Sequence, residues 1–404
     1  MAIVTINPDK TMSIDGKKTF PVLLYSMCHT TIDLMSTITT CDPSKCTDFL
    51  ANIPISSIKW PQQRAEIEYW RPLFEQSNIF WVAGGNVQST ILTQSDIDSP
   101  YFFGYIQIDE PDLYTDVKDL VSKIYTDIKK RDPNHPVILN IYSDPGTWLP
   151  YTDILTYDRY SIRASKIRED CIYDWERQSA GRVFANLKIN EINKPVYAVI
   201  QSNGLVTFDE DPILVPTIQE ARALTYTAIC LDVKGITYWP YKNGGSQQQG
   251  LFANPTLYDY YKQLARELKL LNDILVMPTR TYYHYNNENT SLVIITPNPT
   301  KSIYGYNMNR FSYILKQNGN TWYLFVVNKD INPIANVNIS IQGLTGSMTA
   351  RTIGLSEAGS IPGRTLPVTD GQFTDSFDGL AVHIYEIGSD IPCPPSQCDF
   401  TITQ

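Results

Sequence analysis

The hydrophobic pattern along the chain changes character at about residue 276. Before that point, short runs of consecutive apolar residues alternate with longer segments in which apolar residues recur every three or four positions. The runs are typical of strands buried on both faces of a parallel sheet, and the periodic segments are typical of helices packed on it. After Met277 the helical periodicity disappears, and short strands separated by Asn, Gly and Pro clusters remain.

Strand and helix signals alternate eight times in the first part of the chain. This alternation predicts a (β/α)8 barrel rather than an open sheet, and no Gly-rich phosphate loop follows the first strand to indicate a dinucleotide fold. The predicted strands are 20–28, 55–60, 78–84, 101–108, 136–143, 153–160, 195–201 and 235–241. The main predicted helices are 61–76, 113–130, 169–190, 217–231 and 255–275.

The two patterns divide the chain into two predicted domains and a tail. Residues 1–276 are assigned to the barrel, and residues 277–388 to an all-β sandwich. The clearest sandwich strands are 291–296, 322–327, 337–341 and 381–387. Residues 389–404 are rich in Pro and Cys and are expected to be irregular.

Two adjacent carboxylates, Asp109 and Glu110, stand where the fourth predicted strand ends. Barrel enzymes carry their reactive groups at the carboxyl ends of the strands, so both residues are candidates for catalysis. The alternative is that Asp109 or Asp112 caps the following helix. That alternative suits Glu110 less well, because Pro111 separates it from the helix.

The other predicted strand ends are rich in aromatic and amide side chains and poor in positive charge. A phosphate substrate would need Arg or Lys clamps, whereas indoles, phenols and amides suit a neutral polyhydroxylated substrate. Asp158 is the best second carboxylate, although it could instead pair with Arg159 or Arg222. The candidate substrate-binding residues are Trp81, Tyr142, Tyr160, Gln201, Asn203 and Trp239, of which the two tryptophans have core packing as an alternative. Other polar or aromatic side chains at these ends are His29, Trp60, Asn86 and Asp144.

Composition narrows the function classes. The net charge of −9, with 19% charged residues, argues against a nucleic-acid surface. Four histidines argue against a multi-histidine metal centre, and we expect neither a metal nor a cofactor. No apolar run is long enough to span a membrane and no signal-peptide pattern is visible, so we expect a soluble protein of undetermined oligomeric state.

The cysteines do not settle the redox environment. Cys41 with Cys46 and Cys393 with Cys398 form two C-x4-C pairs. Local disulfides, free thiols and a shared zinc site all remain open for them. The three other cysteines stand in apolar or helical segments and are expected to be buried thiols: Cys28, Cys171 and Cys230.

Several motifs resemble one large group of enzymes. IQIDEP (106–111), DRY (158–160), WPY (239–241) and the segment 218–239 are similar to retaining glycoside hydrolases with a (β/α)8 barrel. The segments 321–341 and 377–387 resemble the β-sandwich that follows the barrel in many of them. The resemblance covers most of the chain and implies a carbohydrate ligand.

The resemblance also implies site residues. The clan's general acid and base is a glutamate at the end of strand four, usually preceded by Asn; here it matches Glu110, preceded by Asp109. The clan's nucleophile is a glutamate at the end of strand seven, where this chain has Gln201 or Asn203. An amide is a far weaker nucleophile than a carboxylate, so retaining hydrolysis by the clan's route is not expected.

Three interpretations therefore remain. Glu110 can work with another carboxylate, either Asp158 or one from the loop 209–211. Asp109 and Glu110 can share a site in which one of them stays protonated. Alternatively, catalysis has been lost, and the barrel binds glycan or serves as a structural protein of a cell surface or virion. The leading hypothesis is a glycoside hydrolase with Glu110 as proton donor and Asp109 orienting or tuning it.

Overall fold

The computed structural model describes residues 2–24, 64–84, 92–143, 145–179, 192–204, 211–239, 251, 254–282 and 291–388. Several predictions fall on positions outside these residues. They concern the second predicted strand (55–60), residues 180–190 of the predicted helix 169–190, the carboxylates at 209 and 210, and the tail 389–404. They also concern both C-x4-C pairs, Cys28, His29, Trp60, Asn86 and Asp144.

The described barrel strands form one curled parallel sheet. Its order is β4-β10-β9-β8-β7-β6-β5, so the first strand of the barrel pairs with the last, with Val22 opposite Ile236. A strand order that returns to its start is the mark of a barrel, which confirms the predicted architecture. The strands are β4 (Val22–Leu24), β5 (Trp81–Gly84), β6 (Phe102–Ile106), β7 (Val137–Ile141), β8 (Ile154–Asp158), β9 (Val196–Gln201) and β10 (Gly235–Trp239).

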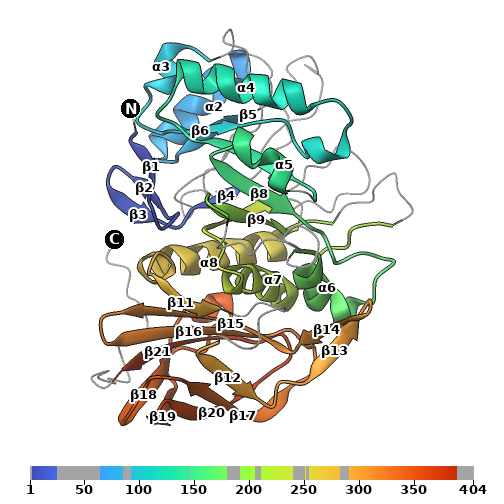
Figure 1. The fold of residues 1–404 in the computed structure, drawn as a ribbon, viewed down its shortest axis with the longest axis vertical. Coiled ribbons are helices and arrows are strands. Elements are labelled where there is room, and N and C mark those ends of the chain that lie inside the picture. The colour runs from blue at the N-terminus through green and yellow to red at the C-terminus, as the bar shows by residue number, and fades with distance from the viewer. Residues whose placement is uncertain are drawn as a thin grey trace.

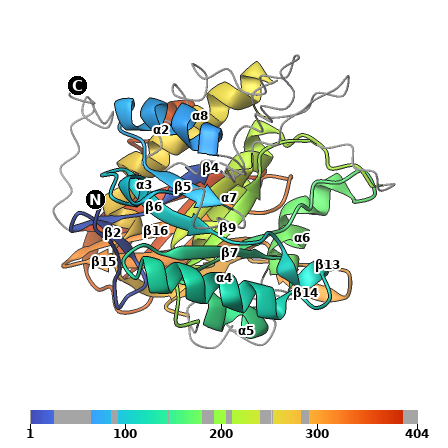
Figure 2. The ribbon, with the colours of Figure 1, turned by 90° about the horizontal axis from the view of Figure 1, so that it is seen from above.

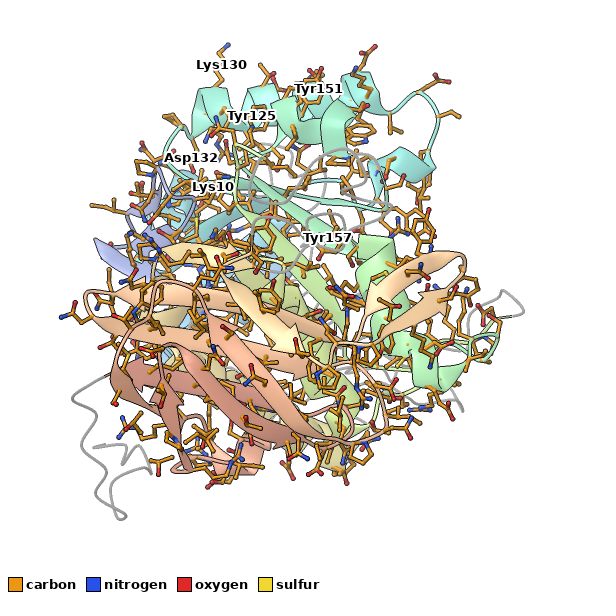
Figure 3. The ribbon with its side chains drawn as sticks, turned by 60° about the horizontal axis from the view of Figure 1, so that its bottom comes forward. Lys10, Tyr125, Lys130, Asp132, Tyr151 and Tyr157 are labelled. Carbon is orange, nitrogen blue, oxygen red and sulfur yellow. The ribbon has the colours of Figure 1, made fainter. Side chains whose placement is uncertain are left out.

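Helices cover the outside of this sheet. Figure 2 shows α2 and α8 on one side of the strands and α4 on the other. Figure 3 shows Tyr125 and Lys130 on α4 and Asp132 at its end. The helices are α2 (Arg64–Gln76), α3 (Gln94–Ile97), α4 (Lys118–Arg131), α5 (Pro145–Trp148), α6 (Cys171–Gln178), α7 (Ile218–Cys230), α8 (Pro255–Leu270) and α9 (Asn272–Leu275), with 3₁₀ turns η1 (Pro111–Leu113), η2 (Leu149–Tyr151) and η3 (Arg168–Asp170).

Helix boundaries differ from the prediction in two places. The helix after the fourth strand begins at Lys118, not near residue 113, so Asp109 and Asp112 do not cap it. The predicted helix 255–275 is interrupted at Leu271, between α8 and α9. In contrast, α7 begins as predicted, because Thr217 and Glu220 form a reciprocal capping box at its start.

The inside of the barrel is closed at the amino ends of the strands. Alternate strand residues such as Leu23, Val82 and Ile138 point inward and pack together. A three-stranded antiparallel sheet packs against them, contributing Met12 and Ile14. Its strands are β1 (Val4–Ile6), β2 (Met12–Ile14) and β3 (Lys17–Thr19).

The second part of the chain is all β, as predicted. Nine antiparallel strands pair in the order β11-β15-β16-β21-β18-β19-β20-β17-β12 and fold over a core of their own. A separate hairpin, β13 (Thr300–Ile303) with β14 (Tyr306–Asn309), stands beside this sheet. The other strands are β11 (Thr279–Tyr282), β12 (Val293–Thr296), β15 (Phe311–Asn318), β16 (Thr321–Asn328), β17 (Ile334–Ile341), β18 (Ser347–Thr352), β19 (Thr365–Thr369), β20 (Gln372–Phe377) and β21 (Val382–Gly388), and one 3₁₀ turn, η8 (Ser356–Ala358), follows β18.

The barrel and the sandwich share a buried interface. Figure 1 shows α6, α7 and α8 between the barrel strands and the sandwich. Tyr226 of α7 stacks on Phe325 of β16, with ring centroids 6.2 Å apart. Two buried ion pairs, Arg222 with Glu267 and Lys329 with Glu176, lie in the same region. This contact fixes where the β13–β14 hairpin stands relative to the barrel mouth.

The described helices do not meet the requirements of a membrane span. None of them has both the length and the apolar character that crossing a bilayer demands. The division of the chain at residues 276 and 277 stays a prediction, with α9 ending at Leu275 and β11 beginning at Thr279.

Candidate functional site at the barrel mouth

The backbone turns sharply where β6 ends, and this turn sets the direction of Glu110. The residue has φ 42° and ψ 54°, in the left-handed region that non-glycine residues seldom occupy. Such a conformation costs on the order of 1 kcal/mol or more, and it is concentrated at functional positions. The Glu110 N–H donates to the carbonyl of Asn140 in β7 at 3.1 Å, which holds the turn against the neighbouring strand.

Asp109 belongs to a chain of hydrogen bonds that crosses three strands. Asn140 Nδ2 donates to Asp109 Oδ1 at 2.9 Å, and Thr156 Oγ1 donates to Asn140 Oδ1 at 3.0 Å. Asn140 and Thr156 are inward-facing residues of β7 and β8, and both are buried. The amide therefore fixes the Asp109 carboxylate at the top of the barrel, close enough to act on Glu110 electrostatically.

The side chains of Glu110 and Asp158 lie close enough together that each affects the pKa of the other. Asp158 ends β8, faces inward and is buried. The Glu110 carboxyl lies within hydrogen-bonding reach of Asp158, and burial followed by the Asp158 charge raises the pKa of Glu110 well above its usual value. Burial also raises the pKa of Asp158, although the proton donated by Glu110 opposes this rise. At neutral pH, Glu110 therefore keeps the proton and Asp158 accepts the hydrogen bond.

Tyr160 and Trp239 line one side of this pair. The Tyr160 hydroxyl donates to Asp158 Oδ2 at 3.1 Å. Its ring stacks on Trp239 at the end of β10, with centroids 5.1 Å apart and planes 29° from parallel. Burial and the Asp158 charge raise the pKa of Tyr160, so the phenol remains a donor. The predicted residues Asp158, Tyr160 and Trp239 thus lie together with Glu110.

Gln201 and Asn203 have a different environment. Gln201 is fully buried, accepts from the backbone of Ile162, and donates to the carbonyls of Ile162 and Leu214. Asn203 is also buried and donates to the Trp239 carbonyl. Both amides join the segments that follow neighbouring strands, and neither lines the cavity described below.

Trp81 lies on the other face of its strand. It is fully buried among the residues between the sheet and its helices, and its ring packs against Phe102 with centroids 4.7 Å apart. Its neighbour Val82 takes the inward position instead. Of the predicted binding residues, Trp81 is thus separated from the cavity by the strand itself.

A cavity of about 720 Å³ opens beside the Glu110–Asp158 pair. Tyr142, one of the predicted binding residues, lies at its edge with its ring 3.7 Å above the Arg159 guanidinium. The cavity is also lined by residues that the sequence analysis did not assign to the site. These are Leu113, Arg159, Arg163, Lys166, Arg177, Gln178, Tyr304 and Tyr306. Asp211, from the loop that the sequence analysis named as a source of a second carboxylate, lines the cavity as well.

The cationic lining differs from the expected neutral site. Positive charge was predicted to be sparse at the strand ends, yet Arg159, Arg163, Lys166 and Arg177 all line the cavity. The segment 159–168 contains four Arg or Lys residues directly after the sixth predicted strand, which was a usable signal. No comparable signal linked the distant Tyr304 to the barrel.

Three further features concern the part of the chain that the structure describes. Arg222, considered as a partner for Asp158, pairs with Glu267 instead. Within the described ranges, no group of three or more His, Cys, Asp or Glu side chains is arranged to hold a metal ion. Cys171 and Cys230 are buried free thiols, as predicted.

Comparison with known proteins defines the class of fold. No family model and no curated protein sequence matches the chain. A solved glycoside hydrolase is similar in structure, with a TM-score of 0.59, 14% identity, and coverage of 96% of this chain and 97% of that one. An α-amylase from Geobacillus thermoleovorans, solved with acarbose, has a TM-score of 0.55 at 10% identity, with 93% and 100% covered.

A third structure extends the same comparison. An arabinofuranosidase has a TM-score of 0.50 at 10% identity and covers 96% of this chain and 100% of its own. At these identities the likeness concerns the fold. The chain therefore has the barrel-plus-sandwich fold of glycoside hydrolases, and the resemblance first seen in IQIDEP, DRY and WPY is confirmed at that level.

Proposed function

We propose that this protein is a glycoside hydrolase that cleaves a glycan bound in the cavity at the barrel mouth, with Glu110 as the proton donor. The observation that carries the proposal is the carboxyl pair formed by the half-buried Glu110 and the buried Asp158. Its surroundings raise the pKa of Glu110, so this carboxyl holds a proton at neutral pH and faces a cavity large enough for sugar units. The glycosidase fold is consistent with this chemistry.

Each member of the pair has a distinct role in the proposed reaction. Glu110 donates its proton to the glycosidic oxygen as the bond from that oxygen to the anomeric carbon breaks. Asp158 keeps its negative charge and opposes the positive charge that develops on the sugar ring. Water then adds to the anomeric carbon, and the proton it releases restores the acid.

The neighbouring groups hold the pair in this state. Tyr160 donates to Asp158 and so favours its ionised form, while the negative charge of Asp109 favours the protonated form of Glu110. Tyr142 and Tyr160 offer aromatic surface at the cavity, which suits the apolar face of a sugar ring. Asp109 is thus proposed as a tuning residue and Glu110 as the catalytic one.

A second candidate is a barrel that binds glycan without cleaving it. Gln201 stands at the position that matches the clan's nucleophile. Its side-chain amide forms three hydrogen bonds to backbone groups. In addition, a hydrogen-bonded carboxyl pair is closer than the roughly 5–5.5 Å of retaining enzymes or the roughly 6.5–9.5 Å of inverting ones. Hydrolysis in this site therefore requires the bound sugar to separate the carboxyl groups of Glu110 and Asp158.

The test is release of reducing ends from a panel of polysaccharides and oligosaccharides by the wild-type protein and by Glu110→Gln. We expect turnover by the wild type and a loss of about 10²- to 10⁴-fold in the variant, the range usual for a general acid. Glu357→Gln is the matched control, because Glu357 is exposed on the sandwich and far from the mouth in sequence and fold.

The outcomes separate the two candidates. If Glu110→Gln hydrolyses as fast as the wild type, Glu110 is not the proton donor. If the wild type binds glycan but never cleaves it, the second candidate replaces the first. A denaturant titration of both variants shows that any loss of turnover is not a loss of folding.

A further inference from the structure

We propose that one wall of the cavity is a subsite for an acidic sugar, one that carries a carboxylate or a sulfate. The wall combines the segment after β8, helix α6 and the β13–β14 hairpin of the sandwich, and we call it the hairpin wall. This inference rests on the proposed function, because it names the substrate class of the same cavity. Its residues are Arg163, Lys166, Arg177, Tyr304 and Tyr306.

The two tyrosines present aromatic surface next to cations. Tyr304 and Tyr306 are 58% and 42% exposed, which is unusual for large rings unless they serve a contact. Lys166 lies 4.5 Å and Arg177 4.9 Å from the Tyr304 ring centroid, and Arg177 lies 5.7 Å from that of Tyr306. Rings and positive charges therefore face the same space.

The backbone at Tyr304 is in an unfavourable conformation for its residue type. Ile303 pairs with Tyr306, so Tyr304 and Gly305 form a two-residue hairpin loop with φ values of 48° and 84°. Such a loop favours Asn-Gly, and an aromatic residue in the left-handed region costs on the order of 1 kcal/mol. A ring kept at that cost, exposed at a cavity edge, is a candidate for recognition.

Cations exceed carboxylates on this wall. On the hairpin wall, Arg163, Lys166 and Arg177 stand with one described lining carboxylate, Asp211, whereas Glu110 and Asp158 line the cavity at the strand ends. Asp211 accepts from the Ser165 backbone, lies 3.8 Å from Arg163 and is affected electrostatically by Lys166. One carboxylate is shared between two of the cations, which leaves positive charge for a ligand.

Arg177 has a separate structural partner. Its Nε and Nη2 donate to Asp174 at 2.9 and 2.6 Å, and Asp174 is almost fully buried behind it. This ion pair fixes the guanidinium in place while it still lines the cavity. The wall therefore contains the almost fully buried Arg177 and the half-buried Arg163 and Lys166, of which Arg163 also donates from Nε to the Tyr160 carbonyl at 2.8 Å.

The hairpin is held firmly against the barrel. Ile303 and Met308 pack with Tyr173 of α6 in a small buried cluster. Lys301 forms an ion pair with Asp170 at the start of the same helix. Contacts on both strands of the hairpin thus position its tip, and the site is preorganised rather than assembled by the ligand.

An acidic sugar matches these features better than a neutral one. Its ring can lie on Tyr304, while its carboxylate or sulfate accepts hydrogen bonds from Lys166 and Arg163. Charge-assisted hydrogen bonds are worth about 1.5–3 kcal/mol, so each such contact corresponds to about tenfold or more in affinity. With a neutral hydroxyl in its place, Arg163 and Lys166 would have only the single carboxylate of Asp211 between them on this wall.

The experiment is a glycan array carrying neutral, uronate-containing and sulfated oligosaccharides, probed with the full chain. Titration calorimetry of the strongest binder then compares wild type with Lys166→Gln and Tyr304→Asn. We expect binding of acidic members only, weakened about tenfold or more by Lys166→Gln and further reduced by salt. The matched control is Lys262→Gln, since Lys262 also lies over a tyrosine ring, 5.4 Å from Tyr258, outside the cavity.

Tyr304→Asn tests the subsite with a variant that is expected to keep the fold. Asn suits the left-handed loop position, so this variant should melt no lower than wild type while binding the acidic glycan more weakly. The array itself decides between carboxylate and sulfate as the acidic group. If both variants bind as tightly as wild type, the hairpin wall is not the subsite.

The remaining outcomes separate this inference from the proposed function. Equal binding of neutral and acidic glycans overturns the acidic subsite and leaves glycan processing in place. Binding of no glycan at all overturns both. Acidic binding that is lost in Lys166→Gln, alongside hydrolysis by the wild type, supports both.

Discussion

Two glutamates of this protein, the buried Glu267 and the half-buried Glu110, have opposite electrostatic environments. Glu267, in the interface between the barrel and the sandwich, pairs with Arg222 and also accepts from Ser360, Tyr226 and the Leu355 backbone. These partners outweigh burial and lower its pKa. Glu110, at the barrel mouth, has Asp158 as its closest partner, and its pKa is raised.

The contrast shows that the buried charge of Glu267 has a counter-charge and hydrogen-bond donors, as a stable interface requires. At the interface, the guanidinium and the hydroxyl donors keep Glu267 ionised. At the mouth, burial and the neighbouring carboxylates Asp158 and Asp109 instead raise the pKa of Glu110, so it keeps its proton beside a cavity. An uncompensated pair at a cavity is the arrangement expected of a catalytic acid.

The largest expected effect comes from the same substitution at both sites. Glu267→Gln leaves Arg222 buried without a counter-charge, so we expect a loss of about 3–5 kcal/mol in the free energy of unfolding. Glu110→Gln removes an uncompensated acid, so the free energy should stay unchanged or rise slightly. Urea unfolding of both variants measures the difference.

A second variant checks the reason for that loss. Arg222→Met in the Glu267→Gln background removes the orphaned cation and should recover part of the stability. If Glu110→Gln costs as much as Glu267→Gln, then Glu110 also has a structural partner, and the proposed contrast between the two sites fails.

The next effect is the dependence of stability on pH. The folded pKa of Glu110 is raised, so above the ordinary value of 4.5 the folded state keeps a proton that the unfolded state releases. Stability from this group is therefore present at low pH and falls as pH rises, by up to about 1.4 kcal/mol per pH unit for each retained proton. Unfolding at several pH values above 4.5 should give a negative slope, smaller in Glu110→Gln.

Glu267 should make the free energy of unfolding change with pH in the opposite direction. Its folded pKa is lowered, so its stabilisation is present above 4.5 and is lost as pH falls through the folded value. Glu267→Gln should thus reduce the slope of stability against pH only on the acid side. If Glu110→Gln leaves the neutral and alkaline slope unchanged, the shared proton is absent.

The smallest expected effect is the loss of stability when either of two tyrosine hydroxyls is removed. Tyr226 donates to Glu267 at 2.5 Å and Tyr160 to Asp158 at 3.1 Å. Removing either hydroxyl by Tyr→Phe should cost about 1 kcal/mol where the acceptor is ionised. At about pH 5 the cost should persist in Tyr226→Phe but shrink in Tyr160→Phe, because the raised pKa of Asp158 leaves it partly protonated. Equal costs at every pH would contradict the difference in ionisation.

Much of the barrel mouth could be predicted from the chain. Glu110 and Asp158 end two strands of a parallel sheet, and such ends meet at one rim whatever the details of packing. Tyr160 and Trp239 follow from the same rule. The capping box of α7 was equally local, since Thr217 and Glu220 stand three residues apart.

Other positions depended on contacts that no local pattern records. Trp81 was expected at the site, but a continuous apolar strand has no alternation to indicate which side faces inward, and a register shift between Trp81 and Val82 adds to the ambiguity. Gln201 is a polar residue at a strand end, yet the backbone groups around Ile162 and Leu214 occupy its amide.

The sequence by itself determined the strand and helix order, the change to an all-β second domain, and the carboxyl pair at the rim, because these depend on periodicity and on strand ends. Only the tertiary structure decided that Arg177 and Tyr304 line the same cavity as Glu110. That tyrosine lies far along the chain from Glu110, and it reaches the site because the interface of α6, α7 and α8 with the sandwich brings the β13–β14 hairpin to the barrel mouth.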